Sequence, residues 1–215
     1  MLPDSSEAIV IRTSADVATH TEPHVHHTGL SLIEPGDLRR LNAELPVMSA
    51  FTRAVKEGPE HDKQYRLWLL TVYQNSAYTP QADKLPAAWS ALVAEVTRDS
   101  FRGWLSARTG VDLEGTALEV NVSLREPGDF RNVHRGKTDR AMNAVLVLNE
   151  RWPQDAGGTY QLWTGKDAAE PVRRIHPVPG GLYTVVPSAS SWHSVSPVSA
   201  HAPGQLLTLA LGYSR

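Results

Sequence analysis

Two histidines in the second half of the chain stand in surroundings that suit metal chemistry. His134 lies in the stretch 130–140, and His193 lies in the stretch 188–198. The sequence has no cysteine, which excludes disulfide frameworks, thiolate zinc sites, cysteine nucleophiles and iron–sulfur clusters. Imidazole is then the natural ligand for Fe(II), and two histidines with open coordination positions suit chemistry with oxygen. We therefore predict that His134 and His193 bind a metal ion.

Composition argues against several classes of partner. The sequence has 21 Lys and Arg against 23 Asp and Glu, with a net charge of −2 and no basic block, so nucleic acid is not an expected partner. No window approaches 18 consecutive apolar residues, so no membrane span is expected. Residues Met1–Asp4 have neither the positive nor the apolar region of a signal peptide. We expect a cytoplasmic protein whose partner is a small-molecule substrate, free or carrier-bound.

The first half of the chain has mainly helical spacing. A turn at residues 35–37 precedes leucines at helical spacing over 38–45. Aromatic and branched residues over 64–73 predict a buried strand. Apolar residues over 85–105 recur on one face, which predicts one long helix that ends at Gly110.

After residue 110 the apolar period changes to two. Over 118–124, apolar residues alternate with Glu119, Asn121 and Ser123, which predicts a half-buried strand. Further strands are predicted at 141–148, 159–163, 172–178, 182–187 and 206–213. Turns rich in Gly and Pro separate them, as in an all-β sandwich or barrel, and the preceding helices are expected to buttress one face. The predicted fold class is therefore mainly β (α+β).

The chain is predicted to contain one domain with a short extension. We assign 1–30 to an N-terminal extension and 31–215 to a single domain, with helical support at 31–110 and the β core at 111–215. The extension contains four histidines close together, His20, His24, His26 and His27. Because histidine-rich segments near a terminus are commonly solvated, we expect this patch to be exposed rather than to bind a metal.

The order of segments around the two histidines resembles a known pattern. Its most specific parts, in chain order, are Leu148-Asn149, Trp152, Gly157-Gly158 and His193–Val198. Residues 116–214 resemble the double-stranded β-helix (jelly-roll, cupin-like) core of the Fe(II)/2-oxoglutarate-dependent dioxygenases, in their prolyl-hydroxylase-like branch. The resemblance implies an oxidoreductase that uses Fe(II), held by His134 and His193, and 2-oxoglutarate as co-substrate.

The metal motif departs from the family at one position. The family has His-x-Asp, whereas this chain has His134-Arg135-Gly136, so the usual third ligand is absent. In one interpretation, Gly136 leaves a coordination position open for a halide such as chloride, and the reaction is halogenation. In a second, water fills the position and hydroxylation persists. In a third, Asp139 bends back as an unusual ligand.

The co-substrate motif departs as well. The family has a basic residue on the last strand that binds the 2-oxoglutarate carboxylate, and the nearest match here is the uncharged Gln205. Thr208 matches the neighbouring hydroxyl. A basic partner from elsewhere is expected, with Arg131, Arg140 and Arg151 as candidates, and Tyr160 is a candidate hydrogen-bond donor.

Two further residues are candidates for contact with the substrate. Trp192 directly precedes His193, and Asn121 shares a strand face with Glu119 and Ser123. Loss of both family residues also leaves a second class of function open. The barrel would then be a non-catalytic ligand-binding module, or an isomerase or cyclase that does not consume 2-oxoglutarate.

Overall fold

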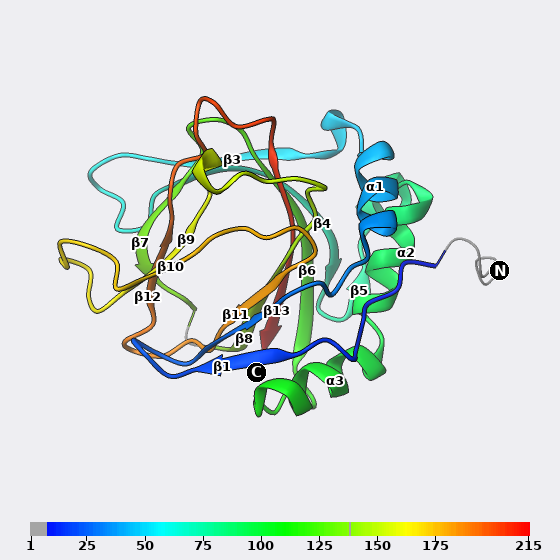
Figure 1. Ribbon diagram of the computed structural model, residues 1–215, viewed down its shortest axis with the longest axis horizontal. Helices are drawn as coiled ribbons and strands as arrows, with labels where there is room; N and C mark the ends of the chain where they lie inside the picture. The colour runs from blue at the N-terminus through cyan, green and yellow to red at the C-terminus, as the bar shows by residue number, and fades with distance from the viewer. Residues whose placement is uncertain (1–7, 138) are drawn as a thin grey trace.

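The computed structural model describes residues 8–137 and 139–215, and within them a curled antiparallel sheet of 13 strands forms a half-barrel with three α-helices outside it (Figure 1). The expectation for Met1–Asp4 lies outside the described residues. The helices are α1 (Pro35–Ala43), α2 (Ala87–Val96) and α3 (Asp99–Thr109), with short 3₁₀ turns at Met48–Ala50, Pro80–Lys84 and Gln154–Ala156. The strands are β1 (Val17–His20), β2 (His26–Gly29), β3 (Thr52–Lys56), β4 (Tyr65–Gln74), β5 (Ala77–Tyr78), β6 (Ala117–Arg125), β7 (Arg131–Arg135), β8 (Arg140–Val147), β9 (Tyr160–Trp163), β10 (Arg173–Ile175), β11 (Leu182–Val185), β12 (Trp192–Val195) and β13 (Leu206–Ser214).

The strand order brings distant parts of the chain together. It runs β1-β2-β11-β8-β13-β6-β4-β7-β12-β9-β10, with β3 and β5 paired to β4. A large part ending at β4 joins a small part beginning at β7 through the single pair Tyr65 and Arg131. The sheet curls at this junction, so its two parts face each other (Figure 1). The predicted mainly β fold of the jelly-roll, double-stranded β-helix type is confirmed.

Alternation along β6 gives the large sheet two different faces. Its even-numbered residues Leu118, Val120, Val122 and Leu124 are buried in the main core with the helices. Its odd-numbered residues, Glu119, Asn121, Ser123 and Arg125, line a cavity inside the barrel. Successive side chains of a strand point to opposite faces, so one strand both holds the helices and builds the site.

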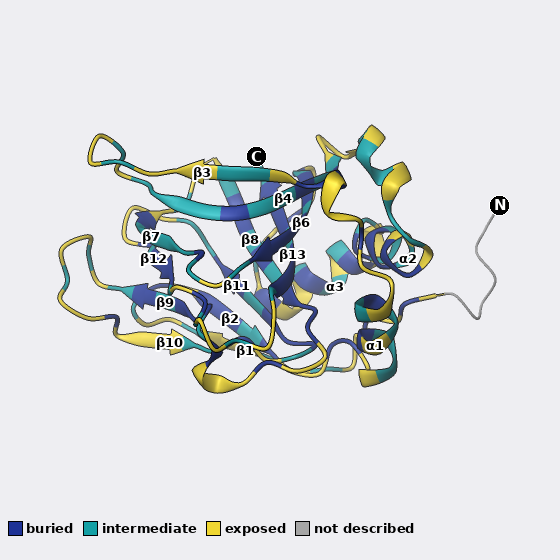
Figure 2. Cartoon of the chain, turned by 90° about the horizontal axis from the view of Figure 1, so that it is seen from above, coloured by how far each residue is buried: buried dark blue, intermediate teal, exposed yellow. Residues whose placement is uncertain are grey.

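The helices cover the outer face of the large sheet (Figures 1 and 2). Trp89 of α2 is fully buried, and its indole Nε1 donates a hydrogen bond to the Leu41 carbonyl of α1 (3.0 Å). The single long helix predicted over 85–105 is wrong: the chain forms α2 and α3, with an extended residue, Arg98, between them. The break turns the chain so that Val96 and Phe101 both reach the core. Gly110 does end α3, with φ of 69° in the left-handed region that glycine favours.

The histidine patch was expected to be exposed, but the structure buries most of it. β1 and β2 form a hairpin, and β2 pairs with β11, so this part of the predicted extension belongs to the sheet. His24, His26 and His27 are buried, at 5%, 0% and 0% exposure. The polar histidines have no apolar alternation that would have predicted a strand, because their burial depends on β11, some 150 residues further along the chain. Both ring nitrogens of His24 are buried without a hydrogen-bond partner.

Nothing in the described ranges resembles a membrane-spanning helix, since each helix is too short or too polar to cross a bilayer.

Burial of His24 should make the fold sensitive to acid. Burial, reinforced by the neighbouring His26, lowers the pKa of His24 to about 4. The unfolded chain takes up a proton near pH 6.5 whereas the folded chain does not, so stability falls as the pH falls below about 6.5. Between pH 7.5 and 4.5, the free energy of unfolding of His24→Phe should fall by roughly 2 kcal/mol less than that of the wild type, as measured by urea unfolding. His201→Phe, a matched change at an exposed histidine, should follow the wild type, and parallel curves for all three proteins would contradict this prediction.

Candidate active site

The two predicted metal-binding histidines lie side by side on neighbouring strands. His134 is on β7 and His193 is on β12, and the antiparallel register places them directly opposite each other. Their ring centroids are 4.3 Å apart, and the ring planes meet at 61°. Both side chains line the same cavity. The pairing of strands that are far apart in the sequence therefore brings the two imidazoles within reach of one ion.

Backbone hydrogen bonds fix the chemical form of both rings. The Nδ1 of His134 donates to the Asn132 carbonyl, and the Nδ1 of His193 donates to the Ser191 carbonyl, each at 2.8 Å. This leaves Nε2 of each ring as the nitrogen available to a metal, an arrangement typical of metal-binding histidines. Burial, together with His193 and Arg131, lowers the pKa of His134 to about 2, and burial lowers that of His193 to about 3 against the Ser191 hydrogen bond. Both rings are neutral at pH 7, as ligation requires.

No carboxylate completes this pair. Among residues 8–137 and 139–215, no group of three or more His, Asp or Glu side chains is placed to hold a metal. Gly136 lines the cavity two residues after His134, and a Cβ there would have no neighbour closer than Pro187 at 3.4 Å. Asp139 is exposed and does not line the cavity, so the structure gives no support to its interpretation as an unusual ligand. The residues present fit a metal ion held by two imidazoles and by ligands from outside the chain.

The cavity that contains the pair is strongly cationic. It has a volume of about 380 Å³, and its walls combine apolar side chains with several charged ones. Its cationic residues are Lys63, Arg125, Arg131, Lys137 and Arg140. Within the described part of the chain, its single acidic residue is Glu119, which pairs with Arg140 at 2.9 Å. Such a surplus of positive charge indicates a ligand with negative charge.

Arg125 is one of the cavity cations that sequence reasoning missed, with Lys63 and Lys137. It ends β6, is 6% exposed, and its Nε is buried without a hydrogen-bond partner. Within the described residues no carboxylate forms an ion pair with it. Burial lowers its pKa to about 10, which still leaves the guanidinium charged at neutral pH. The available signal was the alternation of β6, which continues from Glu119, Asn121 and Ser123 to Arg125 on the inner face.

Hydroxyl groups surround the space beside Arg125. Thr208 and Ser123 are hydrogen-bonded to each other (2.7 Å), and both line the cavity. Tyr160 packs against His193 with ring centroids 5.3 Å apart, and against Tyr183 at 4.7 Å. Burial raises the pKa of both tyrosines, so each keeps its phenol proton and can donate a hydrogen bond. Thr208 and Tyr160, predicted as co-substrate residues, thus line the same cavity as the histidine pair, and Tyr160 packs against His193.

The structure places three other predicted residues away from this cavity. Arg151 is exposed, and with Gln205 it lines a separate cavity of about 280 Å³. The Gln205 amide donates to Glu126 (3.2 Å). Trp192 lies on the opposite face of β12 from His193, and the guanidinium of Arg135 stacks over its ring at 4.9 Å. Contact of these three side chains with a ligand in the main cavity is therefore not supported.

Asn121 and Arg140 do line the cavity. The Asn121 amide donates to Glu119 (2.6 Å), and its carbonyl accepts from Thr71 (2.6 Å). Arg140 donates to Glu119 and to Asn143, each at 2.9 Å. These contacts form one connected polar network along the inner face of the large sheet.

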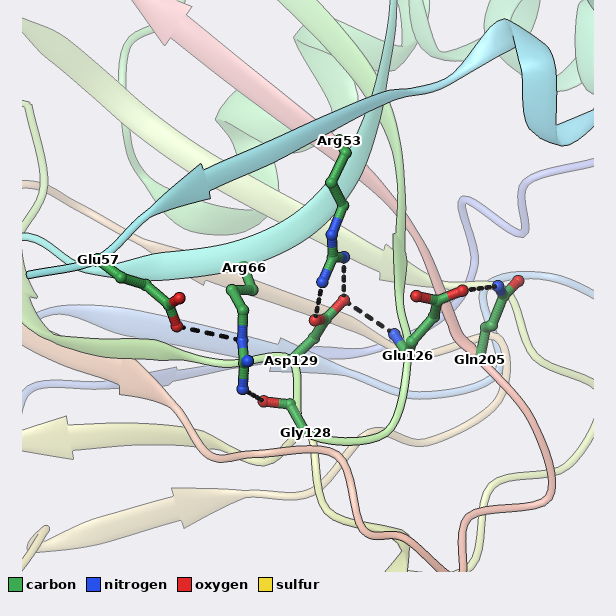
Figure 3. Close-up of polar contacts among 7 residues, drawn as sticks. All are labelled: Arg53, Glu57, Arg66, Glu126, Gly128, Asp129 and Gln205. Carbon is green, nitrogen blue, oxygen red and sulfur yellow. Dashed lines mark hydrogen bonds and ion pairs between the residues drawn. The ribbon is translucent and has the colours of Figure 1, made fainter.

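A buried ion pair fixes the turn that leads from β6 to the histidine strand β7 (Figure 3). Asp129 is 1% exposed, and Arg53 of β3 donates to both of its carboxylate oxygens at 2.6 Å. The Glu126 amide also donates to Asp129 (3.0 Å). Burial acts to raise the pKa of Asp129, but the bonds from Arg53 and Glu126 and the charges of Arg53 and Arg66 outweigh it and lower the pKa.

The same turn is tied to the segment that follows the second histidine. Gly128 donates its amide to the Val198 carbonyl (2.8 Å), and Val198 donates to the Asp129 carbonyl (3.0 Å). Arg66 of β4 donates to the Gly128 carbonyl at 2.8 Å (Figure 3). The Arg53–Asp129 pair and these bonds of the turn, together the Asp129 clamp, therefore connect the strands of both histidines to the large sheet.

Comparisons with known proteins agree with this geometry. Residues 120–209 match the family model of the 2OG-Fe(II) oxygenase superfamily. The prolyl 3-hydroxylase OGFOD1 of Mus musculus is 28% identical over 113 residues, which cover 51% of this chain but only 19% of the mouse protein. The resemblance to the prolyl-hydroxylase-like branch is confirmed.

Solved structures share the fold. A prolyl-4-hydroxylase from Pseudomonas putida matches with a TM-score of 0.57 and 21% identity, over 91% of this chain and 95% of that one. A 2OG-Fe(II) oxygenase family oxidoreductase from Burkholderia pseudomallei matches with a TM-score of 0.57 and 14% identity, over 84% and 78%. A prolyl hydroxylase from Trichoplax adhaerens, solved with a hypoxia inducible factor peptide, matches with a TM-score of 0.54 and 17% identity, over 83% and 75%. At these identities the likeness concerns the fold.

Removal of the clamp should destabilise the protein. Arg53→Met leaves the buried Asp129 carboxylate without its cation, and we expect a loss of roughly 3 kcal/mol in the free energy of unfolding at pH 7, measured with urea. The control is Arg98→Met, which removes an arginine from the exposed Glu95 pair and should cost about 0.5 kcal/mol or less. Equal effects of the two substitutions would show that the Arg53–Asp129 pair has no special role.

Metal binding should depend on both histidines. We expect His134→Ala and His193→Ala each to weaken Co(II) binding, followed by visible absorption, by roughly 100-fold, because one imidazole alone cannot hold the ion. His201→Ala, at an exposed histidine outside the cavity, should bind Co(II) like the wild type. Gly136→Asp should bind more tightly, since the site has space for the added carboxylate. Undiminished binding in both alanine variants would rule out this metal site.

Proposed function

From the match of residues 120–209 to the 2OG-Fe(II) oxygenase superfamily, we propose that this oxygenase, prolyl-hydroxylase-like in its core, hydroxylates a small substrate with 2-oxoglutarate as co-substrate. His134 and His193 would hold Fe(II). The bound ion would supply the chemistry in which O₂ oxidises 2-oxoglutarate to succinate and CO₂, with one oxygen atom entering succinate and the other entering a substrate C–H bond as hydroxyl.

The unpaired guanidinium of Arg125 in the same cavity as the histidine pair is the observation that supports this proposal most. A buried charge without a partner costs several kcal/mol, so a cation at such a position is typical of a site that binds an anion. 2-Oxoglutarate has two carboxylates. One would pair with Arg125, where the guanidinium can donate two parallel hydrogen bonds, and the other would face the metal.

The strand register would allow Arg125 to bind the carboxylate that the basic residue of the last strand binds in the family. In the family the basic residue lies on the last strand, which here is β13. Leu206 of β13 is directly opposite Arg125 of β6. Because directly opposite residues share a face, a basic side chain on β6 reaches the space that a basic residue on β13 would occupy. The hydroxyls of Thr208 and Ser123 lie next along the same strands and would bind the same carboxylate.

Other residues of the cavity would orient the ligands. Tyr160 packs against the His193 ring and holds it in place. Arg131 lies close enough to both histidines to lower their pKa values, and its charge would favour an anionic ligand next to the metal. Leu67, Leu69 and Val195 form apolar wall that would exclude water from the reacting groups.

We favour hydroxylation over halogenation because the named relatives are hydroxylases. Their substrates also suggest that proline, free or within a peptide, should be the first compound tested. In both reactions Gly136 leaves a coordination position to a ligand from outside the chain.

The proposal is tested most directly at Arg125. With Fe(II) present and oxygen excluded, 2-oxoglutarate should raise the Tm of the wild type, and Arg125→Met should weaken 2-oxoglutarate binding roughly 30-fold or more. Without ligand, Arg125→Met should be at least as stable as the wild type, because it removes an unpaired buried charge. With oxygen admitted, the wild type should form succinate, and Arg125→Met should form less.

Two variants serve as controls. Arg151→Met, at the exposed arginine of the second cavity, should leave the 2-oxoglutarate effect unchanged. Arg125→Lys should keep part of the binding, because it retains the charge without the second donor. If 2-oxoglutarate neither stabilises the wild type nor yields succinate, the proposal fails, and a non-catalytic binding module or an isomerase would take its place.

A further inference from the structure

A second cationic region lies around Gly136 in the same cavity. Lys63 precedes β4, Lys137 directly follows Gly136, and Arg140 begins β8. All four residues line the cavity, and none of them is needed to hold the co-substrate proposed above. The region therefore calls for a separate explanation.

Contacts with three strands hold the Arg140 side chain in this region. Its guanidinium lies across β13 at Gly212, where any Cβ would collide with it. Glu119 of β6 and Asn143 of β8 hold it from two sides, and its side chain is only 13% exposed. Its Nε is buried without a partner. A glycine on one strand and acceptors on two others thus fix one guanidinium at a single place.

Asn143 connects Arg140 to the open metal position. Its amide Nδ2 lies 3.7 Å from the place that a Cβ of Gly136 would take. Its Oδ1 already accepts from Arg140, which leaves the NH₂ group to donate to a ligand. The side where the family carboxylate is missing is therefore lined by hydrogen-bond donors.

The charges in this region are not balanced by the protein. Among the described residues, neither Lys63 nor Lys137 forms an ion pair with an acidic side chain. Burial, with the charges of Arg131, Lys137 and Arg140, lowers the pKa of Lys63 to about 8. Among the described residues, the cavity has five cationic residues and one acidic residue, and the two charges of 2-oxoglutarate would leave two of the cations without a counter-charge. Crowding of like charges is unfavourable unless an anion joins them.

We propose that the substrate carries a carboxylate, and that Lys63, Lys137 and Arg140 bind this carboxylate beside Gly136. This inference rests on the proposed function, which assigns the other end of the cavity to the co-substrate. The carboxylate belongs either to a small free acid or to an acidic side chain of a peptide. The cavity, at about 380 Å³, is at the lower end of small-molecule sites and has to hold the co-substrate as well, so only a small substrate group fits inside.

Binding of matched probes tests the proposal. With Fe(II) and 2-oxoglutarate present and oxygen excluded, titration calorimetry compares L-proline with L-prolinamide, and Ac-Glu-Pro-Glu-NH₂ with Ac-Gln-Pro-Gln-NH₂. We expect the acid to bind roughly tenfold more tightly than its amide in at least one pair. A preference within the first pair identifies a free acid as the substrate, and a preference within the second identifies an acidic peptide.

Lysine variants show which residues produce the preference for the acid over the amide. Lys63→Met with Lys137→Met should reduce it to about twofold or less, and neither lysine has an ion-pair partner whose loss would disturb the fold. Lys84→Met, at an exposed lysine outside the cavity, should leave the preference unchanged. Equal binding of acid and amide in both pairs, no binding of any probe, or a preference that survives the double substitution would overturn the proposal.

The co-substrate measurement separates this inference from the function on which it rests. The double lysine variant should still be stabilised by 2-oxoglutarate, whereas Arg125→Met should not. If 2-oxoglutarate stabilises the wild type but the acid preference is absent, only the substrate assignment is wrong. If 2-oxoglutarate has no effect on the wild type, the proposed function is wrong and this inference falls with it.

Discussion

The antiparallel pairing of β7 with β12 sets His193 directly opposite His134, and the whole site depends on this register. A shift of one residue would turn β12 over relative to β7 and present Trp192 or Ser194 to the cavity in place of His193. Each ring is further fixed by its Nδ1 hydrogen bond to a backbone carbonyl two residues earlier in the chain. Register decides which residues meet, and the backbone bonds decide which nitrogen they offer.

The rest of the fold holds these two strands in place. In the strand pairing, the small sheet joins the large one at a single residue pair, Tyr65 with Arg131, so this pairing alone gives a weak connection. The buried Arg53–Asp129 pair and the bonds between the Asp129 turn and Val198 strengthen it. Helices on the outer face supply the apolar core, which leaves the inner face free to be polar.

Electrostatics give this cavity its individual character. Gly136 has no side chain to place negative charge beside the histidine pair, and Arg125, Arg131 and Arg140 add positive charge around the same cavity. Such an arrangement is unfavourable in the empty protein, because the guanidinium groups repel one another and are partly removed from water. It favours anions strongly when they bind. Any further negative charge in this cavity would therefore have to come from a bound ligand.

The sequence by itself determined the strands that alternate strictly, the two histidines, and the glycine that follows the first of them. Alternation over 118–124 predicts a strand whatever surrounds it, because side chains of a strand must point to alternate faces. It does not tell which face meets the helices and which meets the cavity. The sequence pattern therefore cannot show that Arg125 joins Asn121 in the cavity, or that Arg151 and Trp192 lie outside it. The burial of His24, His26 and His27 likewise depends on β11, which lies far along the chain. Only the tertiary structure decided these points, because a side chain's partners across a sheet come from strands whose pairing is not encoded locally.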